Sequence, residues 1–300
     1  MGLMIDGEYL VDDPAPDTAS GGRFERAKST LRDPIPDGAA PSRLHLYAAW
    51  NCPWAHRALL TRAVLGLDEI TVSYALPRRT DQGWVFEEEP LLGVAAMHQV
   101  YAAGADAYTG RVTVPVLWDK ETGRILNNES ADIVRAMGEA YAPGRLYPRD
   151  KADDIDSWNA MIYPALNNGV YRAGFARTQD AYDEAVADVF AALDRIEAQL
   201  SQNRYLAGDT LTEADIRLFP TLARFDVAYH SAFKCNLRRL IDYTNLWAYA
   251  RDIYQTPGVA GTVDFDIYRR GYHSPSELRN PLGIVPIGPQ NDWRAPHGRG

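Results

Sequence analysis

The feature that most constrains the fold is a strand-to-helix turn that contains a cysteine. Residues 44–47 predict a short buried strand, and the apolar side chains of residues 58–65 recur with helical spacing. Between them lies the segment 50–57 (WNCPWAHR), with Pro53 at the first helical position, where its missing N–H costs no hydrogen bond. We therefore expect Cys52 to stand at the N-terminus of a helix.

The predicted position of Cys52 favours a reactive thiol. Free backbone N–H groups and the positive end of the helix dipole stabilise the thiolate and lower the pKa of the thiol, and His56 and Arg57 add positive potential. The alternative is a buried structural cysteine. Ala55 occupies the fourth position of a would-be Cys-x-x-Cys motif, so the chain lacks an adjacent resolving thiol. An external small-molecule thiol is then the simplest partner for a redox cycle.

Composition narrows the possible partners and compartments. The net charge of −9 argues against nucleic acid and anionic membranes as partners. Cys52 and Cys235 are the only cysteines, so we expect no disulfide framework and a reducing, cytoplasmic location. The sequence shows no signal peptide, no apolar run near the roughly 18 residues of a membrane helix and no metal-ligand spacing. We therefore predict neither a membrane partner nor a bound metal.

The first half of the chain predicts an α/β unit behind an irregular arm. Residues 1–42 are rich in Asp, Pro and Gly, which indicates an irregular arm that Phe24 would anchor. Within residues 43–141 the pattern predicts strands over 44–48, 70–76, 111–119 and 124–126, and helices over 53–66 and from Ser130 onward. This order indicates a mixed sheet. The three glutamates at 87–89 are expected to be solvated.

The second half is predicted to be almost entirely helical. Residues 141–148 break the pattern and indicate a linker. The region 150–272 then predicts helices over 150–166, 178–200 and 243–254, and a helix that begins at Thr212 with a capping box. The tail 273–300 is expected to be irregular.

Several motifs together resemble those of the glutathione transferases. These are the Cys-Pro turn, a strand entered through Val114-Pro115, and the helix start Asn128-Glu129-Ser130, followed by an all-helical region. The segments 83–86 (GWVF), 167–171 (NNGVY), 233–235 (FKC) and 280–286 (NPLGIVP) resemble more narrowly the glutathionyl-hydroquinone reductases, the Xi class. The resemblance spans nearly the whole chain. It implies a thioredoxin-like α/β N-terminal domain over 43–141 and an all-α substrate and dimer domain over 150–272.

The resemblance also implies a binding site for glutathione, the expected co-substrate. In that superfamily the proline after such a valine is cis, and the adjoining backbone pairs with glutathione as with an extra strand. Glu129 and Ser130 would hold the γ-glutamyl end, and Trp84 would cover the tripeptide. The family's glutathione-contacting segment matches Arg111, Val112, Thr113 and Val114. The residues alone leave open a trans proline, a plain helix cap, a core tryptophan and a solvated arginine.

Three tyrosines receive roles from the resemblance alone. Tyr171 would be the proton donor and acceptor, while Tyr229 and Tyr272 would help to lower the pKa of Cys52 and bind substrate hydroxyls. A phenol suits this work because it donates a hydrogen bond and its ring stacks on aromatic substrates. The chain has 17 tyrosines, so most of them must be structural. Cys235 is expected to be a buried, inert thiol.

The activity implied by the resemblance is the glutathione-dependent reduction of glutathionyl-hydroquinones. The reaction would pass through a mixed disulfide between Cys52 and glutathione and release oxidised glutathione, in a homodimer. One alternative is an omega-like dehydroascorbate reductase or deglutathionylase, which would not need the three tyrosines. Another is a non-catalytic glutathione-binding module.

Overall fold

A computed structural model describes residues 2–11 and 20–299. These residues form two compact units. The first contains residues 2–11 and 27–143, and the second contains residues 20–26 and 144–299. The N-terminal segment therefore contributes to both units.

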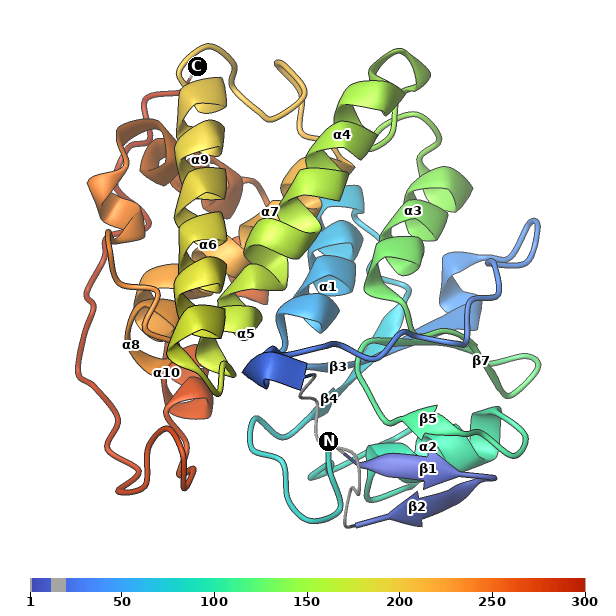
Figure 1. Ribbon diagram of the computed structural model, residues 1–300. Coiled ribbons are helices and arrows are strands. Elements are labelled where there is room, and N and C mark those ends of the chain that lie inside the picture. The colour runs from blue at the N-terminus through green and yellow to red at the C-terminus, as the bar shows by residue number, and fades with distance from the viewer. Residues whose placement is uncertain (1, 12–19, 300) are drawn as a thin grey trace. The chain divides into compact units, whose positions relative to one another are not determined.

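A mixed four-stranded sheet with the order β4-β3-β6-β7 is the centre of the first unit. The strands are β3 (Leu44–Ala49), β4 (Thr71–Ala75), β6 (Val116–Asp119) and β7 (Arg124–Asn127). Strand β3 runs parallel to β4 and antiparallel to β6. Helices α1 (Pro53–Leu65) and α3 (Ser130–Tyr141) pack side by side (Figure 1). The predicted α/β fold of this half is confirmed.

The expectation of an irregular arm over residues 1–42 was wrong for residues 3–10. Strands β1 (Leu3–Ile5) and β2 (Glu8–Leu10) form a hairpin, and β1 also pairs with β5 (Gly110–Arg111) (Figure 1). Strands this short carry too few residues for an alternating pattern, and the partner lies about a hundred residues away. Phe24 is buried as expected. The part of the prediction that concerns residues 12–19 lies outside the described residues.

The predicted strand over 111–119 was too long, and one helix of the first unit was missed. Regular pairing in β6 begins only at Val116, after the cis Val114–Pro115 bond. Helix α2 (Met97–Gly104) lies in the segment to which the sequence pattern assigned no structure.

Glu89 contradicts the expectation of a solvated acidic run. Its side chain is buried. Its carboxylate accepts hydrogen bonds from five groups, namely the N–H groups of Leu91, Leu92 and Gly93 and the hydroxyls of Tyr47 and Ser73. Burial acts to raise the pKa of Glu89, but the backbone N–H groups outweigh it and hold the pKa below its usual value.

The second unit is helical, as predicted. Its elements are α4 (Ala152–Ile162), η4 (Tyr163–Asn167), α5 (Gly169–Gly174), α6 (Gln179–Leu200), α7 (Glu213–Arg224), η5 (Phe225–Tyr229), α8 (His230–Ala232), α9 (Thr244–Gln255) and α10 (Phe265–Tyr272). The 3₁₀ turns of the chain are η1 (Ser20–Gly22), η2 (Pro41–Arg43), η3 (Arg149–Lys151), η6 (Leu240–Asp242) and η7 (Ala260–Thr262).

Helix boundaries follow the local signals in most places. The capping box at α7 is confirmed, because the Asp215 carboxylate accepts the Thr212 N–H at 2.8 Å. The predicted helix over 150–166 instead divides into α4 and the π-helical turn η4, which contains Pro164. Helix α10 was not predicted.

The C-terminal tail has no helix or strand among the described residues after Tyr272, yet it is held firmly. The guanidinium of Arg299 donates to the carbonyls of Leu200, Asn203 and Arg204, where α6 ends. Trp293 is buried against aromatic side chains of α7, α9 and α10. None of the described helices has the length and apolar character needed to cross a bilayer.

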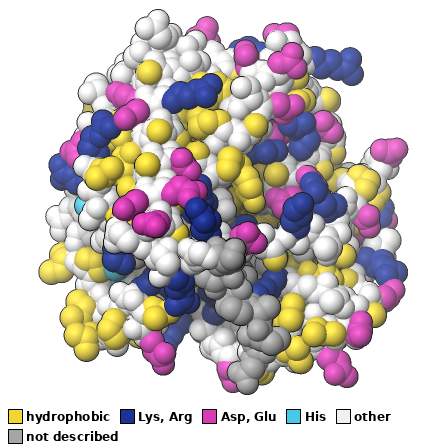
Figure 2. Space-filling view, in the orientation of Figure 1, with side chains coloured by type: hydrophobic (Ala, Val, Ile, Leu, Met, Phe, Trp, Pro, Cys, Tyr) yellow, Lys and Arg dark blue, Asp and Glu magenta, His cyan; other side chains and the backbone are white. Residues whose placement is uncertain are grey.

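The visible surface carries both signs of charge. Figure 2 shows acidic and basic side chains interspersed on the face drawn, with apolar side chains between them. On this face, the charges of the described residues form no large patch of a single sign (Figure 2).

A buried histidine in β3 predicts a pH-dependent stability. The His45 ring nitrogens lie 2.7 Å from Thr71 Oγ1 and 3.0 Å from Ser73 Oγ, and burial lowers the pKa of His45 to about 4. The unfolded chain binds this proton at higher pH, so the free energy of unfolding should fall as the pH drops from about 6.5 to 4, by on the order of 3 kcal/mol. Urea unfolding across this range should show a larger loss in the wild type than in His45→Gln, in which carboxylates such as Glu89 still titrate. Equal losses in both proteins would contradict it.

Candidate active site

Cys52 is the N-cap residue of α1. The chain leaves β3 at Ala49, the Cys52 N–H donates to the Ala49 carbonyl at 3.0 Å, and Pro53 begins the helix. The Cys52 side chain is partly exposed, whereas Cys235 is fully buried and burial raises its pKa to about 12. The expected burial of Cys235 is confirmed, and Cys52 is the more accessible thiol.

The segment before β6 lies beside the Cys52 thiol. Cys52 Sγ donates to the Val114 carbonyl at 3.5 Å, and the Val114–Pro115 bond is cis, as the resemblance implied. Val112 and Val114 are both buried in the core. The backbone of this segment is therefore a direct neighbour of the sulfur.

Tyr101 of α2 ties this segment to the start of α3. Its hydroxyl donates to the Thr113 carbonyl at 3.1 Å and accepts a hydrogen bond from the Asn128 side chain at 3.0 Å. Burial raises the pKa of Tyr101, so the phenol stays neutral and keeps its proton to donate. The sequence reasoning missed this residue because no helix was expected there.

The start of α3 provides a second helix N-terminus. Glu129 is its N-cap, and Glu129 Oε1 accepts the Ala131 N–H at 3.1 Å. Ser130 is buried, and its hydroxyl accepts a hydrogen bond from Arg57 of α1 at 3.3 Å. Arg57 thus joins the N-terminal turns of α1 and α3. A buried guanidinium, a hydroxyl and helix N–H groups together suit a carboxylate ligand.

Strand β5 positions Arg111, and the core of the first unit positions Trp84. Arg111 lies in β5 opposite Leu3, and burial lowers its pKa. Trp84 is only 8% exposed and packs in the core of the first unit, with the Arg79 guanidinium 5.3 Å from its ring centre. These contacts match the alternative that the sequence left open for Trp84, a tryptophan packed in the core.

The three tyrosines named by the resemblance come together in the second unit. The Tyr272 hydroxyl lies 2.7 Å from that of Tyr171 and 3.2 Å from that of Tyr229. Burial raises the pKa of Tyr229 and Tyr272 well above the usual value, so both are neutral near pH 7. The cluster is a connected row of phenols that can donate a hydrogen bond or pass a proton.

Phe233 is the common wall of the tyrosine cluster. Its ring centre lies 5.3 to 5.5 Å from those of Tyr171, Tyr229 and Tyr272. The next residue, Lys234, has a φ of +58°, which turns the chain sharply after the ring. Phe233 belongs to the motif 233–235 of the family resemblance, but the sequence indicated no role for its side chain.

Two π-helical turns bring Tyr171 and Tyr229 to the cluster. Turn η4 precedes α5, which carries Tyr171, and η5 ends at Tyr229 itself. Such turns rotate the following side chains out of the regular helical register, and they occur often at functional sites. Pro164 was the one visible signal for η4.

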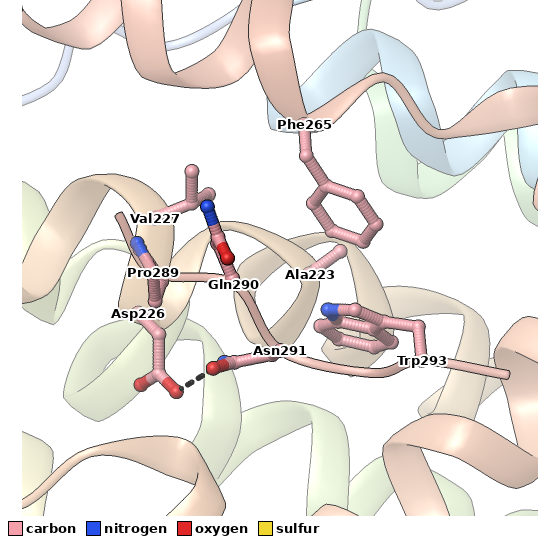
Figure 3. Close-up of a pocket in the computed structure, with 8 residues that line it drawn as sticks. All are labelled: Ala223, Asp226, Val227, Phe265, Pro289, Gln290, Asn291 and Trp293. Carbon is pink, nitrogen blue, oxygen red and sulfur yellow. Dashed lines mark hydrogen bonds between the residues drawn. The ribbon is translucent and has the colours of Figure 1, made fainter. Parts of the chain in front are cut away.

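The C-terminal tail supports η5 from another side. A cavity of about 80 Å³ lies between η5 and the tail. Its walls are Ala223, Asp226, Val227, Phe265, Pro289, Gln290, Asn291 and Trp293 (Figure 3). The Asp226 carboxylate accepts the Leu240 N–H at 2.5 Å and the Asn291 amide at 2.8 Å. These bonds fix the turn that ends at Tyr229.

Arg224 is a buried cation next to the tyrosine cluster that the sequence analysis missed. Its guanidinium lies 3.8 Å from the ring centre of Tyr268 and donates to the Pro220 carbonyl. Burial acts to lower the pKa of Arg224, but the tyrosines outweigh it and raise the pKa, so the side chain stays charged. The available signal was an arginine that follows the uncharged, largely apolar run 218–223. The described residues contain no metal-binding group of His, Cys, Asp or Glu side chains.

Comparison with known proteins identifies the class. Residues 51–140 match the N-terminal domain of glutathione S-transferases, and residues 179–252 match the C-terminal domain. With this fold and these matches, the chain belongs to the glutathione transferases.

Full-length relatives narrow the family. The chain is 45% identical to glutathionyl-hydroquinone reductase YqjG of Escherichia coli, covering 100% of this chain and 98% of that protein. It is 46% identical to glutathionyl-hydroquinone reductase PcpF of Sphingobium chlorophenolicum, over 96% of each. The structure of an Xi-class transferase from Natrialba magadii matches with a TM-score of 0.91 and 41% identity, over 100% of this chain and 96% of that one. Within its class, the chain is a member of the Xi-class glutathionyl-hydroquinone reductase family.

A substitution at Gly174, the last residue of α5, tests how tightly Phe233 packs against the tyrosine cluster. A Cβ at this position would lie 2.2 Å from the Phe233 ring, so Gly174→Ala should displace Phe233 and destabilise the protein by about 1–3 kcal/mol. Gly261→Ala is the matched control, because a Cβ there meets no atom within 4 Å. Thermal unfolding and near-ultraviolet circular dichroism measure the effect. Indistinguishable behaviour of the two variants would show that Phe233 does not constrain the cluster.

Proposed function

We propose that this chain reduces glutathionyl-hydroquinones to hydroquinones, with glutathione as the co-substrate. The observation that carries the proposal is the partly exposed Cys52 thiol at the N-cap of α1, beside the Val114 carbonyl. The names of the relatives YqjG and PcpF support the substrate class, and a solved structure of YqjG with glutathione bound, which matches at a TM-score of 0.83, supports the co-substrate.

Glutathione is proposed to bind along the segment before β6 and at the start of α3. The backbone of Val114 would pair with the cysteinyl part of the tripeptide, which brings its sulfur to Cys52. Glu129 would meet the γ-glutamyl ammonium, while Ser130 and the N–H groups of α3 would meet its carboxylate. The remaining proposed contacts are Trp84, Arg111, Val112 and Thr113.

The first chemical step forms a bond between two sulfur atoms. The Cys52 thiolate attacks the sulfur of the glutathionyl group, and the bond between that sulfur and the ring carbon breaks. The electron pair of the broken bond passes to the ring, which takes up a proton and leaves as the hydroquinone. The ring is reduced by two electrons, and the two sulfurs are oxidised to a mixed disulfide.

The second step restores the enzyme. The thiolate of a second glutathione attacks the glutathionyl sulfur of the mixed disulfide and forms oxidised glutathione, so Cys52 is released as thiolate. The chain lacks a Cys at position 55 that would resolve the disulfide internally, which makes the external thiol necessary.

The tyrosine cluster is proposed to donate a proton to the substrate and to bind its hydroxyl groups. Tyr171 would deliver the proton to the ring carbon that bears sulfur, and Tyr229 and Tyr272 would hydrogen-bond the hydroxyls and help to lower the pKa of Cys52. Their connected hydroxyls support this role, since a proton lost by Tyr171 can be replaced from Tyr272.

The proposal also covers the cellular compartment, the domains and the oligomeric state of the enzyme. Two free cysteines suit a reducing compartment, so we place the protein in the cytoplasm. We also propose two domains, over 43–141 and 150–272, and a homodimer formed through the helical domain. Light scattering coupled to size-exclusion chromatography tests the dimer.

Steady-state kinetics test the covalent step. Cys52→Ser should lose at least about a thousandfold in kcat, since a hydroxyl is a far weaker nucleophile than a thiolate. Cys235→Ser is the matched control and should retain wild-type kcat. Varying glutathione against the conjugate should give the parallel double-reciprocal lines of a ping-pong reaction. Wild-type activity in Cys52→Ser would refute the mechanism.

The same kinetic assays distinguish the proposed reductase from an omega-like dehydroascorbate reductase. An omega-like enzyme would reduce dehydroascorbate with a kcat/KM above that for the glutathionyl-hydroquinone, and Tyr171→Phe would not affect it. The proposed function requires the opposite preference, with Tyr171→Phe slowing the reduction of the conjugate.

A further inference from the structure

The N-terminal segment 20–26 is built into the helical unit. The Arg177 N–H donates to the Gly22 carbonyl at 2.9 Å, and the Thr178 hydroxyl donates to the Gly21 carbonyl at 3.0 Å. Phe24 is buried and stacks on Phe175, with 5.2 Å between ring centres. The segment is thus docked where α5 ends and α6 begins, although residues 2–11 and 27–143 belong to the other unit.

This docking places a cation on Tyr171. The guanidinium carbon of Arg26 lies 4.9 Å from the ring centre of Tyr171, and Arg26 Nε donates to Asn168 Oδ1 at 2.9 Å. Asn168 lies immediately before α5, which carries Tyr171. One side chain therefore contacts both the ring and the start of its helix.

We infer that Arg26 is a positioning residue for Tyr171, held in place by the docking of segment 20–26 on the helical unit. The cation–ring contact and the bond to Asn168 hold the phenol in one orientation. The positive charge also favours negative charge on the Tyr171 oxygen when that phenol gives up its proton. This inference rests on the proposed function, in which Tyr171 is the proton donor.

Other titratable and charged groups also surround Tyr171. The Tyr272 hydroxyl bonds to those of Tyr171 and Tyr229, and the ring centre of Tyr229 lies 6.0 Å from that of Tyr171. Arg224 interacts electrostatically with all three of these phenols from within the core. Arg172, on the same helix as Tyr171, is paired with Glu184 and Asp188. Arg26 differs from these groups because its guanidinium contacts the face of the Tyr171 ring and comes from outside the helix that carries Tyr171.

The test compares substitutions within one segment. Arg26→Met removes the charge while keeping much of the side-chain length, and Arg26→Lys restores the charge without the planar fork. Arg23→Gln is the matched control, because Arg23 lies three residues earlier and pairs with Glu184 at the exposed surface. Such a surface pair contributes little to stability.

The expected result is a selective loss of turnover. Arg26→Met should lower kcat about tenfold, the effect of one cation–ring contact and one charged hydrogen bond, with less than about twofold change in KM for glutathione. The basic limb of the pH profile of kcat should move to higher pH. Arg26→Lys should recover part of the kcat, and Arg23→Gln should stay within about twofold of wild type.

Two outcomes would overturn the inference. One is an Arg26→Met variant with the wild-type kcat and pH profile. The other is an equal loss in Arg26→Met and Arg23→Gln, which would show that the segment only needs to be docked.

A second readout separates this inference from the proposed function. Protein labelled with 3-fluorotyrosine gives a ¹⁹F signal for position 171, assigned by its absence in Tyr171→Phe. That signal should shift in Arg26→Met and not in Arg23→Gln, whether or not the wild type reduces the conjugate. An unshifted signal would reject the inference, whereas an inactive wild type with a shifted signal would reject only the proposed function.

Discussion

The contact between Cys52 Sγ and the Val114 carbonyl is the interaction on which the proposed chemistry of the first unit depends. It follows from the register of the sheet. Tyr47 of β3 pairs with Val116 of β6 in antiparallel fashion, so residues that follow β3 must lie beside residues that precede β6. Pro53 then begins α1 at once and leaves Cys52 as its N-cap. The thiol is thus located by backbone pairing and a helix start, both of which are rigid, and not by a loop.

The tyrosine cluster is built by a different principle. Its three phenols come from the separate elements α5, η5 and α10; Tyr171 follows a π-helical turn, and Tyr229 is the last residue of another. Packing against Phe233 unites them, and Gly174 is required because the Phe233 ring occupies the place of its Cβ. Buried phenols remain neutral, which preserves the protons that a hydrogen-bonding or proton-transferring row needs. Rigid placement of groups with matched protonation states is what acid–base catalysis requires.

Local chemistry explains which parts were predictable from the sequence. Pro53 and the Thr212 capping box each specify a helix start, and the structure has both. The β1–β2 hairpin was missed because its partner β5 is remote in sequence, and the burial of Glu89 was missed because its compensation comes from backbone N–H groups of a turn. The tyrosine cluster depends on tertiary packing, so periodicity gave no basis for choosing Tyr171, Tyr229 and Tyr272 among 17 tyrosines; only the family resemblance did. Arg26 escaped notice for the same reason.

The central claim is that Cys52 exchanges its proton for a glutathionyl group during turnover. Intact-protein mass spectrometry after mixing the enzyme with a glutathionyl-hydroquinone, without free glutathione, tests it directly. The account predicts the addition of one glutathionyl group, located on the peptide that contains Cys52 and removed by added glutathione, with release of one equivalent of hydroquinone. Release of hydroquinone without an adduct, or an adduct confined to Cys235, would contradict it.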